Sequence, residues 1–212
     1  MKTLIVGLPR TGTTSLCIAT TQLGYKTAHT AYTQQALQQA EVIADTPVFH
    51  DFARLAAHFQ ACQFIYLTRS FDLWLPSIRK LLSRMQARLM TQQGGFNDTI
   101  KRCYLETFGH FTAQDLASDD YLISCYQRHQ QRVSTFMAKN NLRCLTLALE
   151  EERALEQLKS VLPAKPGYQC DIMPRSNING KVTAWKDHTH PLVIPSTRDG
   201  KADKDSQLLN FE

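Results

Sequence analysis

The sequence has no two cysteines spaced as in a zinc or redox motif. Its six cysteines are scattered singly through 212 residues, and none forms a Cys-x-x-Cys pair. We therefore expect most of them to be small buried residues in a reducing compartment. No apolar run approaches the length of a membrane-spanning helix. The run from Leu4 to Leu8 is too short for a signal peptide. These absences predict a cytoplasmic protein with no membrane span.

Charge of either sign is also limited. Charged residues make up 20% of the chain and hydrophobic residues 43%, which is typical of a globular protein rather than a disordered one. The net charge of +5 gives no reason to expect nucleic acid as a partner, but it suits a protein that holds a multiply anionic small ligand. With no internal repeat and no evident boundary, residues 1–212 are predicted to form a single domain.

The first sixteen residues predict a strand, a glycine-bearing loop and the start of a helix. Residues 4–6 are apolar strand formers that stop at Gly7, and helical apolar spacing begins at residue 16, just after Gly12. This arrangement binds phosphate. Glycines let the backbone approach the ligand, and the positive end of the helix dipole favours an anion.

The loop lacks the lysine of an ordinary P-loop. The usual Gly-Lys-Ser/Thr ending is replaced by Gly12-Thr13-Thr14, and a cation stands earlier, at Arg10, whose planar fork of donors suits oxyanions. Residues 7–16 resemble the cofactor loop of the P-loop sulfotransferases, which bind 3′-phosphoadenosine 5′-phosphosulfate (PAPS). The resemblance implies that the cofactor is held by Arg10, Thr11, Gly12, Thr13, Thr14 and Ser15.

A second motif follows the strand predicted at residues 64–68. Many P-loop NTPases carry an acidic Mg²⁺ partner at this place, whereas this chain has Arg69, followed by Trp74 and Ser77. Arg69 can make a bidentate contact with a phosphate, and the Ser77 hydroxyl can donate a hydrogen bond to it. Trp74 is expected to be a core residue. The pattern is similar to the sulfotransferase element that grips the 3′-phosphate of PAPS. The resemblance implies Arg69 and Ser77 as cofactor residues, adenosine 3′,5′-bisphosphate as product, and no metal.

This chain differs from the family pattern in two places. Many relatives have a tryptophan after the two loop threonines, where this chain has Ser15, so we expect the adenine to pack on Trp74 or Trp185. Residues 180–188 resemble the late Gly-rich segment that covers the nucleotide in cytosolic members. That likeness is incomplete, because the second glycine and an acidic residue are replaced.

A hydroxyl acceptor needs a general base. Relatives place a His or Glu after the strand that follows the first helical region, and Asp45-Thr46-Pro47 occupies that place here. Asp45 is therefore the first candidate for the base, and His50 and Asp51 are alternatives. Any one of them alone is more often a helix cap or a surface group. Arg10 is expected to stabilise charge on the leaving group.

Strands alternate with helices along residues 1–162, which predicts an α/β three-layer sandwich with a mainly parallel sheet and a ligand at the carboxyl ends of the strands. On the long helix predicted at residues 73–93, Lys80, Arg84 and Arg88 recur on one face, which we expect to be solvated. Residues 163–212 are predicted to be irregular and to cover the cofactor, with a disordered tail beyond Thr197. The further strands and helices are predicted at residues 26–29, 41–47 and 144–149, and at residues 50–61, 98–108, 119–139 and 150–162.

The leading hypothesis is a PAPS-dependent sulfotransferase that acts on a hydroxyl or amine of a small or medium-sized acceptor. A P-loop nucleotide or small-molecule kinase is an alternative. Thr13 in place of the loop lysine and Arg69 in place of an acidic residue count against it. A non-catalytic nucleotide-binding protein stays open because the base is not fixed. The sequence names neither the acceptor nor the oligomeric state.

Overall fold

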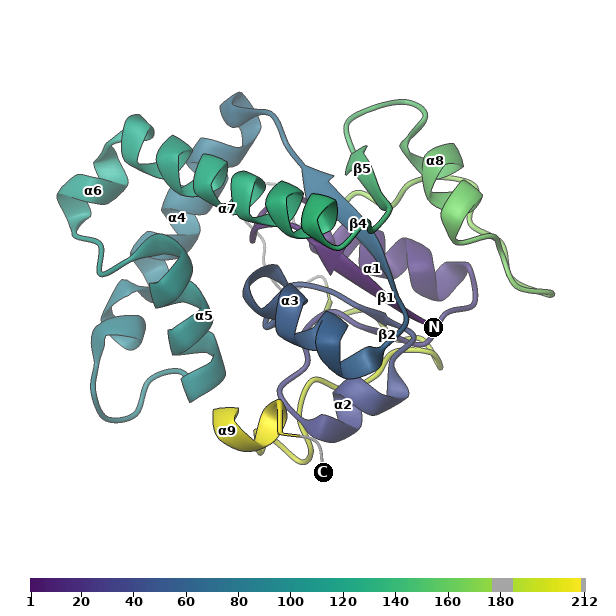
Figure 1. Ribbon diagram of the computed structural model, residues 1–212, viewed down its shortest axis with the longest axis horizontal. Coiled ribbons are helices and arrows are strands. Elements are labelled where there is room, and N and C mark those ends of the chain that lie inside the picture. Colours follow the sequence, from purple (N-terminus) through teal and green to yellow (C-terminus); the bar gives the residue numbers. More distant parts are fainter. Residues whose placement is uncertain (177–184, 211–212) are drawn as a thin grey trace.

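Parallel strands form the centre of the structure (Figure 1), a computed structural model that describes residues 1–176 and 185–210. Within these residues the sheet has five strands in the spatial order β2-β3-β1-β4-β5, all paired in parallel. Leu4 at the centre lies opposite Ile43 on one side and Phe64 on the other. The strands are β1 (Lys2–Val6), β2 (Thr27–Ala28), β3 (Val42–Ile43), β4 (Cys62–Thr68) and β5 (Cys144–Ala148).

Both faces of the sheet are apolar, and each is covered by helices. Leu4 and Val6 pack with α3, α7 and α2 on one face, whereas Ile5 packs with α1 and α8 on the other. This alternation follows from the two-residue period of a strand, and it confirms the predicted three-layer α/β fold. The helices of the described residues are α1 (Thr13–Gln22), α2 (Gln34–Gln39), α3 (Val48–Phe59), α4 (Phe71–Met90), α5 (Asp98–Phe108), α6 (Ala113–Ala117), α7 (Asp119–Lys139), α8 (Ala154–Val161) and α9 (Asp205–Leu208).

Helices α4 to α7 form a further apolar cluster on the side toward which the strands point (Figure 1). Trp74, Phe108 and Leu122 are completely buried in it, and Leu8 from the loop after β1 and Phe49 from the first turn of α3 belong to the same cluster. The cluster therefore attaches the long helices to the edge of the sheet where the strands end. None of the described helices has both the length and the apolar character to cross a membrane.

Most elements lie where the sequence predicts them, and α5 and α7 begin and end at the predicted residues. Both start at a side-chain cap: Asn97 accepts a hydrogen bond from the Ile100 N–H, and Ser118 accepts one from the Tyr121 N–H. The strand predicted at residues 41–47 is shorter, because the backbone leaves the extended conformation by Asp45, where φ is 49°. Helix α6 was missed, since five residues are too few to show helical periodicity.

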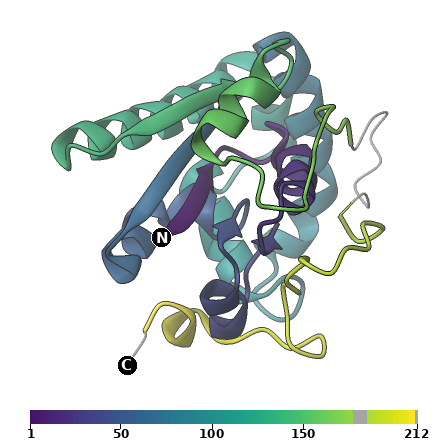
Figure 2. The same ribbon diagram turned by 90° about the vertical axis from the view of Figure 1, so that its right-hand side faces the viewer.

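The expectation of a disordered tail beyond Thr197 is wrong. Leu208 of α9 is completely buried in the cluster that also contains Leu4. Val193 forms a parallel bridge with Thr27 at the edge of the sheet, and Asp203 accepts a hydrogen bond of 2.9 Å from the Gln34 N–H. Figure 2 shows the yellow C-terminal segment running beside α2. These anchors are long-range contacts that the polar composition of the segment does not reveal.

Candidate active site

A cleft of about 690 Å³ opens where the strands end. Because parallel strands have their carboxyl ends at one edge, the residues that follow different strands meet there. Arg10 and Gly12 follow β1, His29 follows β2, Asp45 follows β3 and Arg69 follows β4, and all five line the cleft. Helix α4 forms a further wall.

The loop after β1 has an unusual backbone. Arg10 has φ 75°, in the left-handed region, which costs a residue other than glycine on the order of 1–2 kcal/mol. Two hydrogen bonds from neighbouring elements hold this loop: Arg69 Nη1 donates to the Arg10 carbonyl at 2.8 Å, and Trp74 Nε1 donates to the Pro9 carbonyl at 3.0 Å. Arg69, which lines the cleft, and the buried Trp74 therefore both support the loop.

The N-terminus of α1 points at the cleft without a side-chain cap. Its N-cap residue is Gly12, with φ 106°, and a Cβ there would lie only 2.6 Å from Leu149 Cδ1. A helix leaves its first N–H groups without intrahelical partners and has a positive dipole end. These groups of α1 are therefore suited to an anion.

Four cations line the cleft: Arg10, Arg69, Lys80 and Arg84. Arg10 Nε donates to Ser77 Oγ at 2.8 Å, which joins the loop to α4. Burial lowers the pKa of Arg10, and repulsion by Arg69 and Arg84 lowers it further. Within the described part of the chain, none of the four cations forms an ion pair with a carboxylate. The cleft thus holds an excess of positive charge, which the Asp45 carboxylate offsets only in part.

Asp45 and His29 stand together at the mouth of the loop. Asp45 Oδ2 accepts a hydrogen bond from Thr13 Oγ1 at 3.2 Å and lies 3.8 Å from His29 Nε2, while Asp45 Oδ1 accepts one from the Thr46 N–H at 2.8 Å. His29 Nε2 is also 2.9 Å from Thr14 Oγ1. Burial lowers the pKa of His29, opposed in part by the Asp45 carboxylate, so the imidazole is neutral at pH 7.

A family model described as a sulfotransferase domain matches residues 2–34 and 30–158. The chain belongs to the sulfotransferase family. Comparison with curated proteins finds no match. The family match spans every strand of the sheet and the loops after β1 to β4, so the cleft is built mostly from family elements. The family assigns the chain to enzymes that transfer sulfuryl groups.

Most of the cofactor residues expected from the sulfotransferase motifs come together in this cleft. Thr11 does not: it is almost completely buried, and its hydroxyl and its N–H both donate to the Leu8 carbonyl. Ser15 Oγ lies 2.8 Å from Ser176 Oγ, so the C-terminal segment reaches the cleft at Ser176. The expected residues that line the cleft are Arg10, Gly12, Thr13, Thr14, Ser15, Arg69 and Ser77.

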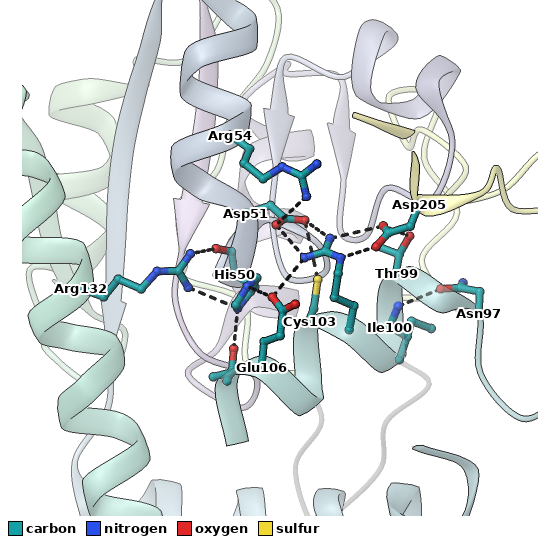
Figure 3. Close-up of polar contacts among 12 residues, drawn as sticks. His50, Asp51, Arg54, Asn97, Thr99, Ile100, Cys103, Glu106, Arg132 and Asp205 are labelled. Carbon is teal, nitrogen blue, oxygen red and sulfur yellow. Dashed lines mark hydrogen bonds and ion pairs between the residues drawn. The ribbon is translucent and has the colours of Figure 1, made fainter. Parts of the chain in front are cut away.

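The three candidate bases of this sulfotransferase are separated by the structure, because only Asp45 lines the cleft. Figure 3 shows His50 and Asp51 in a polar cluster between α3 and α5. His50 Nε2 lies 2.6 Å from Glu106 Oε2, and the Asp51 carboxylate is held by Arg102 through two hydrogen bonds of 2.9 and 2.5 Å. Both residues belong to the first turn of α3, whose packing against α5 and α7 turns their side chains into this cluster.

The two tryptophans have different surroundings. Trp74 is completely buried and its indole N–H is bonded to Pro9, so the expectation that adenine packs on Trp74 is wrong. Trp185 lies against His29, with ring centroids 5.6 Å apart. Residues 180–184, the first part of the late Gly-rich segment, lie outside the described residues.

Sequence reasoning missed His29, Lys80 and Arg84. His29 follows a strand of two residues, and its place after that strand is the signal that could have found it. Lys80 and Arg84 are exposed, as expected, but they face the cleft rather than open solvent. Arg88, the third member of the expected face, stacks on the Phe96 ring instead. In the part of the chain that the structure describes, no three His, Cys, Asp or Glu side chains gather to hold a metal ion.

Proposed function

We propose that the chain is a PAPS-dependent sulfotransferase that transfers a sulfuryl group to a hydroxyl or amine of a small or medium-sized acceptor and leaves adenosine 3′,5′-bisphosphate. One observation carries the proposal: the N-terminus of α1, which has no side-chain cap, shares a cleft with Asp45 and with Arg10 and Arg69, which have no carboxylate ion-pair partner among the described residues. PAPS has two separate anionic groups, at its 3′ and 5′ positions. The donor groups of the cleft fit such a ligand in charge and in number.

The cofactor's two anionic groups are assigned to different walls. Arg10 and the first N–H groups of α1 hold the 5′ side, and Arg69 with Ser77 holds the 3′-phosphate. The 2.8 Å hydrogen bond from Arg10 to Ser77 supports this assignment, because it brings the two walls within reach of one ligand. Charge-assisted bonds from arginine to phosphate are among the strongest hydrogen bonds in proteins.

Asp45 serves as the general base. When bound, the cofactor supplies the sulfuryl group, whose bond to the acceptor atom forms as its bond to the bridging oxygen breaks. Asp45 lines the cleft, and its carboxylate takes the proton of the acceptor at Oδ2, while Oδ1 stays bonded to Thr46. The neutral His29 lies 3.2 Å from Thr13 Oγ1, the hydroxyl that donates to Asp45, and so helps to position the carboxylate.

We place this activity in the cytoplasm, without a resident metal. The six cysteines are free thiols in the structure, which suits a reducing compartment. Arg10, the loop amides and Arg69 provide the charge stabilisation that a metal ion supplies in P-loop kinases.

Nucleotide titration by calorimetry tests the proposal. Adenosine 3′,5′-bisphosphate should bind much more tightly than AMP, or than ATP with Mg²⁺. Ser77→Ala and Arg69→Ala should each reduce the preference over AMP. For Arg69, a charge-assisted contact of about 1.5–3 kcal/mol corresponds to roughly ten- to 150-fold in affinity. Ser77→Ala is informative because it leaves the Arg69 bond to the loop intact.

Arg143→Ala is the control, since Arg143 is exposed and does not line the cleft. Equal affinity of the native protein for adenosine 3′,5′-bisphosphate and AMP would contradict the assignment. Tighter binding of ATP with Mg²⁺ would favour a kinase.

A further inference from the structure

The cleft continues along α4 beyond Ser77. Lys80 and Arg84 follow it by three and seven residues, about 4.5 and 10 Å along the helix axis. Both side chains line the cleft. Since α4 leads away from the sheet (Figure 1), this part of the cleft lies beyond the loop and the groups assigned to the 3′-phosphate.

Lys80 and Arg84 have no acidic partner among the described residues. Arg84 Nε donates to the Lys80 backbone carbonyl at 3.1 Å, which leaves the rest of its guanidinium for another group. Arg79 on the same helix contrasts with them, because it is tied to the Leu116 carbonyl at 2.6 Å and to the Asp119 carboxylate. Arg79 and Arg88 of α4 are therefore used for packing, whereas Lys80 and Arg84 are left without an acidic partner toward the cleft.

The unpaired charges repel one another. Arg84 is near enough to Arg10 to lower its pKa, an effect that Asp45 opposes only in part, so the cleft holds an excess of positive charge. A site of this kind raises the local concentration of an anion and binds it once it arrives. The cofactor's own anionic groups already have donors, in Arg10 with α1 and in Arg69 with Ser77.

Apolar side chains alternate with these cations. Pro76 and Leu81 of α4 line the same cleft, and Tyr104 of α5 faces them and is 5% exposed. Burial raises the pKa of Tyr104 well above its ordinary value, so it stays a neutral phenol. A ligand that fits this wall has an apolar body as well as a negative charge.

Resting on the proposed function, we propose that the acceptor carries an oxyanion, a carboxylate or a phosphate or sulfate ester, on an apolar body. Lys80 and Arg84 bind the oxyanion, the guanidinium as a planar fork and the ammonium as a point charge. The hydroxyl or amine of the acceptor then lies toward Asp45. The two cations determine which acceptors are chosen, not how the cofactor binds.

Binding to the cofactor-product complex tests this without a known acceptor. The protein is saturated with adenosine 3′,5′-bisphosphate and titrated with 4-hydroxybenzoate, 4-hydroxyphenyl phosphate and the uncharged 4-hydroxybenzamide. Both anions should bind about tenfold more tightly than the amide, since each gains charge-assisted hydrogen bonds. Which of the two anions binds more tightly shows whether the acceptor carries a carboxylate or a phosphate ester.

The double variant Lys80→Met, Arg84→Met should bind all three probes alike, with an affinity for adenosine 3′,5′-bisphosphate within about twofold of the native value. Both side chains are exposed, so the fold should be retained. A double variant with the same change of net charge, Lys139→Met, Arg143→Met, lies outside the cleft and should keep the preference.

Equal binding of the anions and the amide to the native protein, including no binding of either, overturns the proposal. So does a preference that survives in the Lys80→Met, Arg84→Met variant. If that variant instead loses about tenfold in affinity for adenosine 3′,5′-bisphosphate, the two cations hold the cofactor and the acceptor assignment is wrong. Failure of the proposed function is seen separately, as a native protein that does not prefer adenosine 3′,5′-bisphosphate to AMP, and the acceptor assignment then falls with it.

Discussion

The Asp45→Asn variant tests the proposed general base separately from binding of the nucleotide. The amide oxygen of asparagine can still accept the hydrogen bond of 2.8 Å from the Thr46 N–H, so the turn after β3 should keep its shape. The amide nitrogen can donate to Thr13 Oγ1, which reverses the present bond of 3.2 Å without breaking it. What the substitution removes is the negative charge and the proton acceptor.

The expected loss in turnover is about a hundredfold or more, as for other general bases. A hundredfold loss corresponds to about 2.7 kcal/mol of transition-state stabilisation. Affinity for adenosine 3′,5′-bisphosphate should stay nearly unchanged, because Asp45 donates nothing to an anion. His29 should stay neutral, because the Asp45 carboxylate raises the pKa of His29 and the variant no longer has that carboxylate.

The assay is single-turnover transfer from labelled PAPS to a panel of phenols and amines, with calorimetry for the nucleotide. His50→Gln is the matched control, because His50 lies in the polar cluster of Figure 3 and outside the cleft. It should have the smaller effect. An Asp45→Asn protein that retains most of its turnover, or a His50→Gln protein that is equally slow, would refute the assignment of the base.

Three further outcomes are expected. Activity should survive EDTA, because Arg10 and the loop amides provide the charge stabilisation; complete loss that Mg²⁺ reverses would speak for a kinase. Burial lowers the pKa of His129 to about 4, so the unfolded state takes up its proton first as pH falls. His129 alone should lower the free energy of unfolding by about 3 kcal/mol between pH 6.5 and pH 4. If urea unfolding of the His129→Gln variant shows the same pH dependence as the native protein, another group is responsible. Gly12→Ala should lower the stability by about 1–3 kcal/mol, because φ is 106° and the new Cβ meets Leu149; an unchanged melting temperature would refute this.

The layers and the parallel sheet could be predicted from the sequence, because they depend on local apolar periodicity. Most residues of the two short motifs meet in one cleft, and their role in cofactor binding stays a prediction. The sequence did not predict that Lys80 and Arg84 line the cleft. Helical spacing tells which residues share a face of α4, but not whether solvent or a cleft lies opposite that face. Asp45, the first candidate for the general base, lines the cleft as expected. Its role as the base stays a prediction.

The C-terminal segment makes contacts that could not be predicted from the sequence. Its polar composition is that of a loop, yet Leu208 is buried and Asp205 pairs with Arg102 of α5. Such anchors depend on partners a hundred or more residues away, as the Asp205 bonds to Thr99 and Arg102 do. No pattern within the segment can indicate them.

The burial of Leu208 in the same apolar cluster as Leu4 has a consequence for how the chain folds as it is synthesised. Strand β1 is synthesised well before its partner β4 and before Leu208, which belongs to the same apolar cluster. Contacts between residues far apart in the sequence cost loop-closure entropy and tend to form late. The growing chain therefore exposes part of this apolar cluster until α9 has been made, and such an unfinished chain is prone to aggregate.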